Sequence, residues 1–303
     1  MSHRFPRPAA LGAALLIAMT GCGGKSIETG DAVVIPDPTV ATASPNTTSS
    51  VPAPTTATST TAAPATTTAA PVKAEGWGTL KGRVTFDGTV PAAKILVAKG
   101  DANAKDAAVC AKSEVKSERL VVDAASKGVK NVIVYIPKPT AVNPEAKAAK
   151  ASASVVFDQK NCVFEPHVLA VMKDVKIDIK SADPVGHNIN SKITNFPFNK
   201  SMAANGSGTE TPVAATRQPG LVVCDIHPWM TAWWVVVDSP YFAVTDDKGN
   251  FEIKNAPAGT QKVVVWQEAT AFATPSTGQD VTIAAGGDTT QDFKLDAAKI
   301  KPE

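Results

Sequence analysis

A cysteine, a histidine and a methionine lie close together in the second half of the chain. Cys224 is followed three residues later by His227 and, after three more, by Met230, and an apolar run at residues 221–223 precedes them. This spacing lets one tight loop direct a thiolate, an imidazole and a thioether toward a common point. Thiolate and thioether favour Cu(I), and imidazole suits Cu(II). The segment therefore predicts a metal site able to hold copper in either oxidation state.

A second imidazole has to come from elsewhere in the chain. The sequence has four histidines, and His3 lies in a segment expected to be removed. His187 stands out because it follows Asp-Pro-Val-Gly, a turn-like segment, and precedes Asn188. Zinc suits this set less well, because structural zinc sites are usually closed by Cys and His ligands. The alternative interpretation is an ordinary buried thiol near a core or surface histidine.

The two segments together resemble the cupredoxins, in particular the amicyanin-like and plastocyanin-like blue copper proteins. In that family a His-Asn pair is followed some forty residues later by Cys-x-x-His-Pro-x-Met, and here 37 positions separate His187 from Cys224. The resemblance covers residues 155–238 and implies a Greek-key β-barrel. It also implies one type 1 copper site with four ligands: His187, Cys224, His227 and Met230.

The same resemblance implies roles for residues around the ligands. Asn188 is expected to tie the two ligand loops together through its side chain and to bring its backbone N–H near the cysteine sulfur. Such partners orient ligands and tune the metal. Pro228 is expected to stiffen the loop. Trp229 and Trp234 are candidates for an apolar docking surface.

The chain from residue 77 onward is all-β in character. Residues 79–86 alternate apolar and polar side chains and end at Asp87-Gly88, which favours a hairpin turn. Residues 107–118 and 143–153 are rich in Ala and Lys and predict either short helices or loops. The expected strands are residues 129–136, 168–172, 175–179, 221–223, 233–237 and 261–266.

A second resemblance concerns the segments on either side of the copper motif. Residues 82–88 follow Gly-x-Val-x-Phe-x-Gly, and residues 245–260 contain Thr-Asp-x-x-Gly-x-Phe and then Pro-x-Gly-Thr. Both patterns are similar to the carboxypeptidase regulatory-like domain, which implies a small immunoglobulin-like β-sandwich. We expect a discontinuous sandwich, residues 77–140 and 240–297, with the cupredoxin-like domain inserted. Three consecutive small units are the alternative.

The N-terminal region predicts export and anchoring. Residues 1–21 read as a lipoprotein signal peptide, with a basic start and an apolar stretch. Cys22 is expected to be lipidated, and Gly23 after it favours the outer membrane in a Gram-negative bacterium. An ordinary signal peptide that leaves Cys22 a free thiol is the alternative. Residues 22–75 form a Pro/Thr/Ala-rich linker with too few large apolar residues to fold.

The remaining cysteines indicate the compartment of the protein, and its net charge limits the kinds of partner that we expect. Cys110 and Cys162 are expected to form a disulfide in an oxidising compartment, periplasmic or at the cell surface. The alternative is a second metal site that joins Cys162 with His167. Removal of residues 1–21 leaves 28 basic and 28 acidic residues, so the charge gives no reason to expect nucleic acid as a partner.

These features favour a membrane-anchored type 1 copper protein that carries single electrons between extracytoplasmic redox proteins. The alternatives are a copper-binding protein for delivery or storage, and a metal-free tethered β-sandwich scaffold. We expect no enzymatic activity, because the sequence offers neither a nucleophile triad nor a glycine-rich phosphate loop.

Overall fold

A computed structural model describes residues 75–302. The predicted signal peptide, the lipidation site Cys22 and the linker up to residue 74 lie outside the described residues. Within residues 75–302 nearly all regular structure is β-strand, which confirms the predicted all-β class. No helix in this part of the chain has the length and apolar character needed to cross a membrane.

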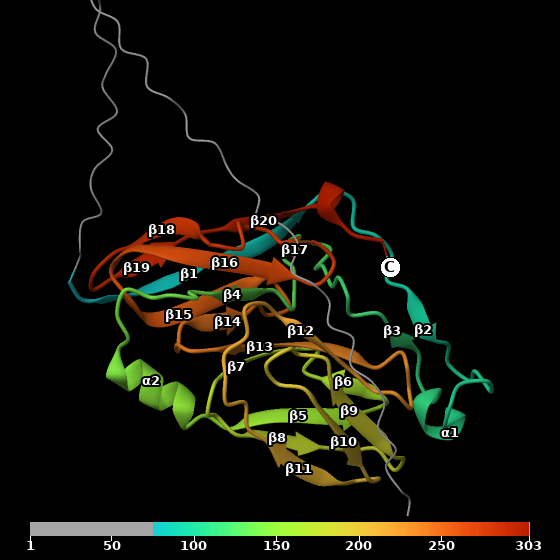
Figure 1. Ribbon diagram of the computed structural model, residues 1–303. Coiled ribbons are helices and arrows are strands. Elements are labelled where there is room, and N and C mark those ends of the chain that lie inside the picture. The colour runs from blue at the N-terminus through green and yellow to red at the C-terminus, as the bar shows by residue number, and fades with distance from the viewer. Residues whose placement is uncertain (1–74, 303) are drawn as a thin grey trace, which may run out of the picture. The chain divides into compact units, whose positions relative to one another are not determined.

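Two sheets combine strands from the beginning and the end of the described chain (Figure 1). The first, here called the β1 sheet, contains β15 (Asn250–Pro257), β1 (Trp77–Asp87), β19 (Asp288–Thr290) and β20 (Phe293–Asp296). The second, the β16 sheet, contains β14 (Phe242–Val244), β4 (Ile133–Tyr135), β16 (Gly259–Gln267), β17 (Ala271–Phe272) and β18 (Gln279–Ile283).

The second half of strand β16 is buried on both faces, which explains the unbroken apolar run from Val263 to Trp266. Val263 and Val265 belong to a core shared with the β1 sheet, whereas Val264 and Trp266 belong to the core on the other side. Successive side chains of a strand point to opposite faces, so a strand between two cores must be apolar at every position. The β16 sheet is therefore the layer between the two cores.

The other two large sheets come from the middle of the chain and enclose the second core. The β12 sheet contains β10 (Phe198–Met202), β9 (His187–Ser191), β12 (Gly220–Val223), β13 (Thr231–Val237) and β7 (Val168–Met172). The β8 sheet contains β11 (Ser207–Glu210), β8 (Ile177–Lys180), β5 (Val155–Lys160) and β6 (Val163–Glu165). Phe157, Ile179 and Trp234 fill the space between them, each fully buried.

A separate excursion of the chain, residues 95–116, lies beside these sheets and is here called the covering segment. It contains the small pair β2 (Ile95–Val97) and β3 (Val115–Lys116) and the single-turn helix α1 (Ala107–Cys110) (Figure 1). Its buried residues Val97, Ala111 and Val115 form a small core that also packs against Trp229. The covering segment is thereby attached to the loop that carries the predicted ligands.

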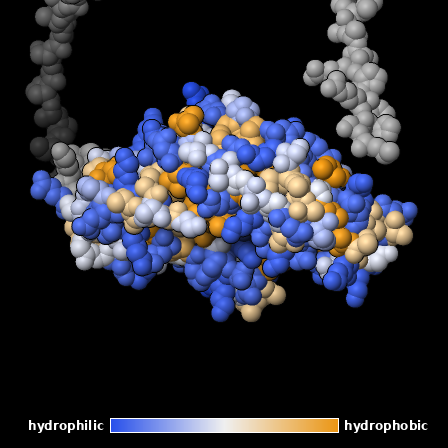
Figure 2. All heavy atoms as spheres, turned by 90° about the horizontal axis from the view of Figure 1, so that it is seen from below, coloured by the Kyte–Doolittle hydropathy of each residue, from blue (hydrophilic) through white to orange (hydrophobic). Residues whose placement is uncertain are grey.

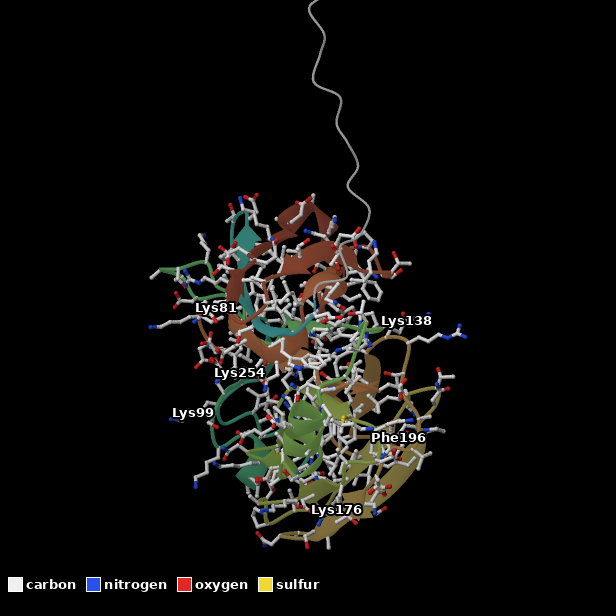
Figure 3. All side chains as sticks on the ribbon, turned by 90° about the vertical axis from the view of Figure 1, so that its left-hand side faces the viewer. Lys81, Lys99, Lys138, Lys176, Phe196 and Lys254 are labelled. Carbon is white, nitrogen blue, oxygen red and sulfur yellow. A yellow bond between two sulfur atoms is a disulfide. The ribbon has the colours of Figure 1, made fainter. Side chains whose placement is uncertain are left out.

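The remaining helices are at the periphery. Helix α2 (Pro144–Ala151) begins at Asn143, whose side-chain oxygen accepts hydrogen bonds from two backbone N–H groups of the first turn. A short 3₁₀-helix, η1 (Ala297–Lys299), follows β20. Exposed lysines such as Lys99, Lys176 and Lys254 lie at the outside of the molecule (Figure 3).

Two local expectations are corrected. Asp87-Gly88 does not close a hairpin: β1 pairs antiparallel with β15 and parallel with β19 and β20. The strands that pair with β1 lie more than 160 residues later in the sequence, because the β1 sheet combines strands from both ends of the described chain. The apolar run at residues 129–136 contributes only Ile133–Tyr135 as a strand, although its remaining valines are buried.

The predicted domain boundaries stay a prediction. Strands from residues 77–140 and 240–297 share the β1 and β16 sheets. The β12 and β8 sheets contain only strands from residues 155–237.

Candidate metal centre

The four predicted ligands lie at one end of the β12 sheet. Antiparallel strands β9 and β12 are neighbours, so His187 at the start of β9 lies near Cys224, which directly follows β12. His227 and Met230 lie in the loop between β12 and β13. Ligand atoms of His187, Cys224 and His227 are all within 4.8 Å of one another. All four side chains are at most 1% exposed.

The ligand loop is closed by its own backbone. The Cys224 N–H donates to the Met230 carbonyl oxygen over 3.1 Å, and the Met230 N–H donates to the His227 carbonyl oxygen over 2.9 Å. These bonds fold the spacing of three residues into a compact turn, and Pro228 restricts its backbone further.

Each histidine ring is held by a carboxylate on its outer nitrogen. His187 Nε2 lies 2.9 Å from an Asp183 oxygen, and His227 Nε2 lies 2.9 Å from an Asp106 oxygen. An ionised carboxylate can only accept a hydrogen bond, so each Nε2 carries a hydrogen. A neutral imidazole then presents an unprotonated Nδ1, the tautomer needed to bind a metal through that atom.

The two Nδ1 atoms face each other at 2.9 Å. Two lone pairs at this distance repel unless a proton or a cation lies between them. The Cys224 sulfur is 3.8 Å from the same His227 Nδ1. The arrangement is that of a buried cation site with two nitrogen donors and one sulfur donor, and the Met230 thioether lies in the same closed loop.

The pKa values of the buried groups are shifted by their neighbours. Burial tends to raise the pKa of the Cys224 thiol, but hydrogen bonds from His187 and from the backbone N–H groups of Asn188, His227 and Ile226 outweigh burial and lower it. Burial likewise tends to lower the pKa of His187, but hydrogen bonds to Cys224 and Asp183 raise it overall. These neighbours favour a proton on Nδ1 of His187 when no metal is bound, and metal binding would displace that proton. The neighbours thus favour the thiolate, which is the metal-binding form of cysteine.

His227 shifts in the opposite direction. Burial lowers its pKa, the Asp106 carboxylate partly opposes this, and the charge of His187 lowers it further. A neutral imidazole is the form that binds a metal. The residues present therefore fit copper: a thiolate, two imidazoles with Nδ1 directed at one point, and a buried thioether.

Asn188 connects the two ligand-bearing segments through hydrogen bonds of its side chain. Its side-chain oxygen accepts from the Asp225 N–H over 2.7 Å, and its amide donates to an Asp225 carboxylate oxygen over 2.7 Å and to Asn199 over 2.8 Å. Its backbone N–H also bonds to the Cys224 sulfur.

The cysteines and the third histidine take up separate roles. Cys110 and Cys162 form a disulfide, as predicted, with their Cα atoms 5.2 Å apart. His167 is 7% exposed, and its Nε2 lies 2.6 Å from Glu268. The alternative second metal site at Cys162 and His167 is therefore wrong, because the disulfide uses the cysteine and the carboxylate holds the histidine.

The predicted docking surface is also corrected. Trp234 is fully buried, with its ring edge-on to Phe157 in the core between the β12 and β8 sheets. Alternation along β13 places this side chain inward. Trp229 is half-buried against the covering segment, and its indole N–H donates to the Cys162 carbonyl oxygen over 3.0 Å. The docking prediction is therefore wrong for Trp234, whereas for the partly exposed Trp229 it stays a prediction.

Sequence reasoning missed the two carboxylates. Asp183 lies four residues before His187, in the segment already singled out, and that proximity could have suggested it. Asp106 lies 121 positions from His227 in a polar stretch, and no sequence pattern marks it.

Comparison with known proteins gives structural matches only. No family model matches the chain, and no match was found among curated protein sequences. About a third of the chain is structurally similar to cupredoxins.

Three solved structures illustrate that similarity. A purple cupredoxin from Nitrosopumilus maritimus is 17% identical over 27% of this chain and 99% of its own, with a TM-score of 0.24. The P52G mutant of amicyanin in its reduced Cu(I) form is 21% identical over 34% of this chain and 97% of its own, with a TM-score of 0.26. A Cu-containing nitrite reductase from Thermus scotoductus is 16% identical over 33% of this chain, with a TM-score of 0.27, and the match spans 27% of the reductase.

Proposed function

We propose that this protein binds one copper ion as a type 1 centre through His187, Cys224, His227 and Met230. The observation that carries the proposal is the pair of Nδ1 atoms 2.9 Å apart beside the Cys224 sulfur. This arrangement requires a proton or a cation between the rings. A bound copper would supply a one-electron couple between Cu(I) and Cu(II).

We further propose electron transfer as the role of this centre. The sulfur ligands Cys224 and Met230 are each 1% exposed. A protein that hands copper to another needs ligands that the acceptor can reach, and these are enclosed. A rigid, buried ligand set instead suits an ion that stays in place while its oxidation state changes. Delivery or storage is the alternative function.

The proposed location is outside the cytoplasm, on a lipid anchor at Cys22 after removal of residues 1–21. The disulfide between Cys110 and Cys162 supports this, because disulfides persist mainly in oxidising compartments. The proposed partners are redox proteins of that compartment. The sandwich formed by the β1 and β16 sheets is proposed as a structural element for the copper domain.

The test is the visible and electron paramagnetic resonance spectrum of the full-length protein after addition of Cu(II) and then ascorbate. We expect an intense charge-transfer band that bleaches on reduction and returns on oxidation. Cys224→Ser should abolish the band because it removes the thiolate. His187→Asn should also abolish it, whereas the matched variant His167→Asn should retain it, since His167 bonds to Glu268 instead.

The outcomes separate the candidate functions. A band that cycles reversibly supports electron transfer. Tight Cu(I) binding without a coloured Cu(II) form would favour delivery or storage. A full-length protein that binds no copper would contradict the proposal and leave a tethered β-sandwich scaffold.

A further inference from the structure

We propose that Asp106 is a positioning residue of the metal centre: the covering segment holds its carboxylate against His227, fixing that imidazole and closing its outer edge. This inference rests on the proposed copper site. The ligand loop itself supplies three of the proposed metal ligands, Cys224, His227 and Met230. The hydrogen-bond acceptor for His227 Nε2, however, comes from Asp106, 121 positions earlier in the chain.

The backbone at Asp106 is arranged for this contact. Asp106 adopts a left-handed conformation with φ of +52°, which is uncommon for a residue with a side chain. It stands at the N-cap position of α1, yet its side chain makes no capping hydrogen bond. An aspartate at this position commonly accepts from the helix backbone. Here its carboxylate bonds to His227 Nε2 instead, over 2.9 Å.

The disulfide fastens the covering segment at the same place. Cys110 lies four residues after Asp106, at the end of α1, and is bonded to Cys162. The two sulfur atoms lie within 4.8 Å of a His227 ring nitrogen. Trp229, two residues after His227, donates its indole N–H to the Cys162 carbonyl oxygen. The disulfide thus fastens the covering segment to Cys162, and the tryptophan fastens the ligand loop to the same residue.

The other ligand histidine is tied to the same disulfide. Asp183 bonds to His187 Nε2 and also accepts the backbone N–H groups of Asn161 and Cys162 over 2.7 and 2.8 Å. The two carboxylates are therefore each held next to one half of the disulfide, Asp106 four residues from Cys110 and Asp183 by a hydrogen bond from the Cys162 N–H. Together they require a hydrogen on each Nε2 and direct both Nδ1 atoms inward.

Closure of the His227 edge has a functional consequence. His227 is 0% exposed, so a partner or a competing chelator cannot contact its ring from outside. The ligand loop presents only Ile226 as a large exposed apolar residue, at 40% exposure. On the face seen in Figure 2, apolar side chains are interspersed among hydrophilic ones. Access to the copper ligands through His227 requires displacement of Asp106.

The experiment compares Asp106→Ala and Asp106→Asn with Asp101→Ala in the full-length protein. Asp101 lies in the same covering segment, and its carboxylate accepts a hydrogen bond from the nearby Asn103 N–H over 2.9 Å. The first readout is the hydrogen exchange of the His227 Nε2–H, followed by nuclear magnetic resonance on metal-free protein labelled with ¹⁵N in its histidines. We expect slow exchange in the wild type and in Asp101→Ala, fast exchange in Asp106→Ala, and intermediate exchange in Asp106→Asn, whose amide oxygen can still accept.

The second readout is copper affinity in competition with a chelator. Loss of a carboxylate that orients a ligand imidazole typically weakens metal binding about 10- to 100-fold, and we expect Asp106→Ala in that range and Asp101→Ala unchanged. Equal exchange or equal affinity in Asp106→Ala and Asp101→Ala would overturn the inference. If the wild type bound no copper, the proposed function would fail, and the exchange comparison on metal-free protein would then decide the role of Asp106. Circular dichroism of Asp106→Asn and Asp106→Ala serves as the folding control. It shows whether a change in exchange or affinity occurs in protein that is still folded.

Discussion

At the scale of a single residue, Asn188 holds the two segments that carry the predicted ligands in place relative to each other. Its side chain makes three hydrogen bonds, two of them to Asp225 in the loop after β12. It is 6% exposed, so few of these bonds can be replaced by water. Asn190 is half-buried and also donates to Asp225, but its hydrogen bonds are exposed to solvent. The two asparagines therefore form a matched pair that separates burial from hydrogen bonding.

We expect Asn188→Ala to lower the free energy of unfolding by about 1–3 kcal/mol, because it removes three hydrogen bonds of a buried side chain and leaves the part-buried backbone N–H of Asp225 without its acceptor. Asn190→Ala should change it by less than about 0.5 kcal/mol, since water can bond to the freed groups. Urea unfolding of the full-length protein measures both. Equal losses of unfolding free energy in the two variants would show that the buried hydrogen bonds of Asn188 contribute no more to stability than the solvent-exposed ones of Asn190.

At the scale of the element, the turn between β14 and β15 explains the Thr-Asp-x-x-Gly-x-Phe pattern. The Asp246 carboxylate accepts the backbone N–H groups of Lys248 and Asn250, which closes the turn. Gly249 adopts φ of +79°, and a Cβ added there would lie 2.3 Å from the Val84 carbonyl oxygen. The glycine is needed both for the turn and for the close approach of β1.

Gly249→Ala is expected to be much more destabilising than Gly100→Ala. Gly100 has nearly the same φ, +78°, but a Cβ there would meet nothing within 4 Å. Each substitution costs about 1–2 kcal/mol for the left-handed backbone. The collision with β1 should add roughly 1–3 kcal/mol at Gly249 alone. Thermal unfolding of both variants checks this, and similar melting temperatures would mean that the turn moves away from β1 at little cost.

At the scale of the whole described part of the chain, β16 couples the two cores. Val264 and Val265 are adjacent and fully buried, and they face opposite cores. Trp233 of β13 and Trp266 of β16 also contact each other, with ring centroids 5.0 Å apart. A disturbance on either side of β16 should therefore reach the other side through a strand that both cores share.

We expect Val264→Ala and Val265→Ala each to lower stability by about 2 kcal/mol, from loss of two buried methyl groups and the cavity that remains. Both variants should move a single unfolding transition to lower urea concentration. The two cores should unfold together, because detaching the β16 sheet from one core would also expose the other. Near-ultraviolet and far-ultraviolet circular dichroism during urea unfolding would detect this. Two separate transitions, each sensitive to only one variant, would contradict the coupling.

Much of this arrangement could be predicted from local patterns. Cys224, His227 and Met230 are recognisable because their donor atoms and their spacing lie within one loop. His187 could be predicted because few histidines were available and a turn precedes it. Strands such as β7, β12 and β13 could be predicted from short apolar runs, which depend on near neighbours alone. Strands β10 and β11 could not, because their residues are mostly polar.

The tertiary structure decided what depends on distant segments. Strand β1 pairs with β15 rather than with the chain that follows Asp87-Gly88, and Trp234 points into a core rather than toward a partner. The Asp106 carboxylate reaches His227 only because the covering segment folds back and is fastened by the disulfide. By itself the sequence determined the donor atoms of the centre and the all-β class, since both follow from residue type and local spacing. The contact of the Asp106 carboxylate with His227, and the closed edge of that ring, were decided only when segments more than a hundred residues apart came together, and such contacts leave no periodic pattern in the chain.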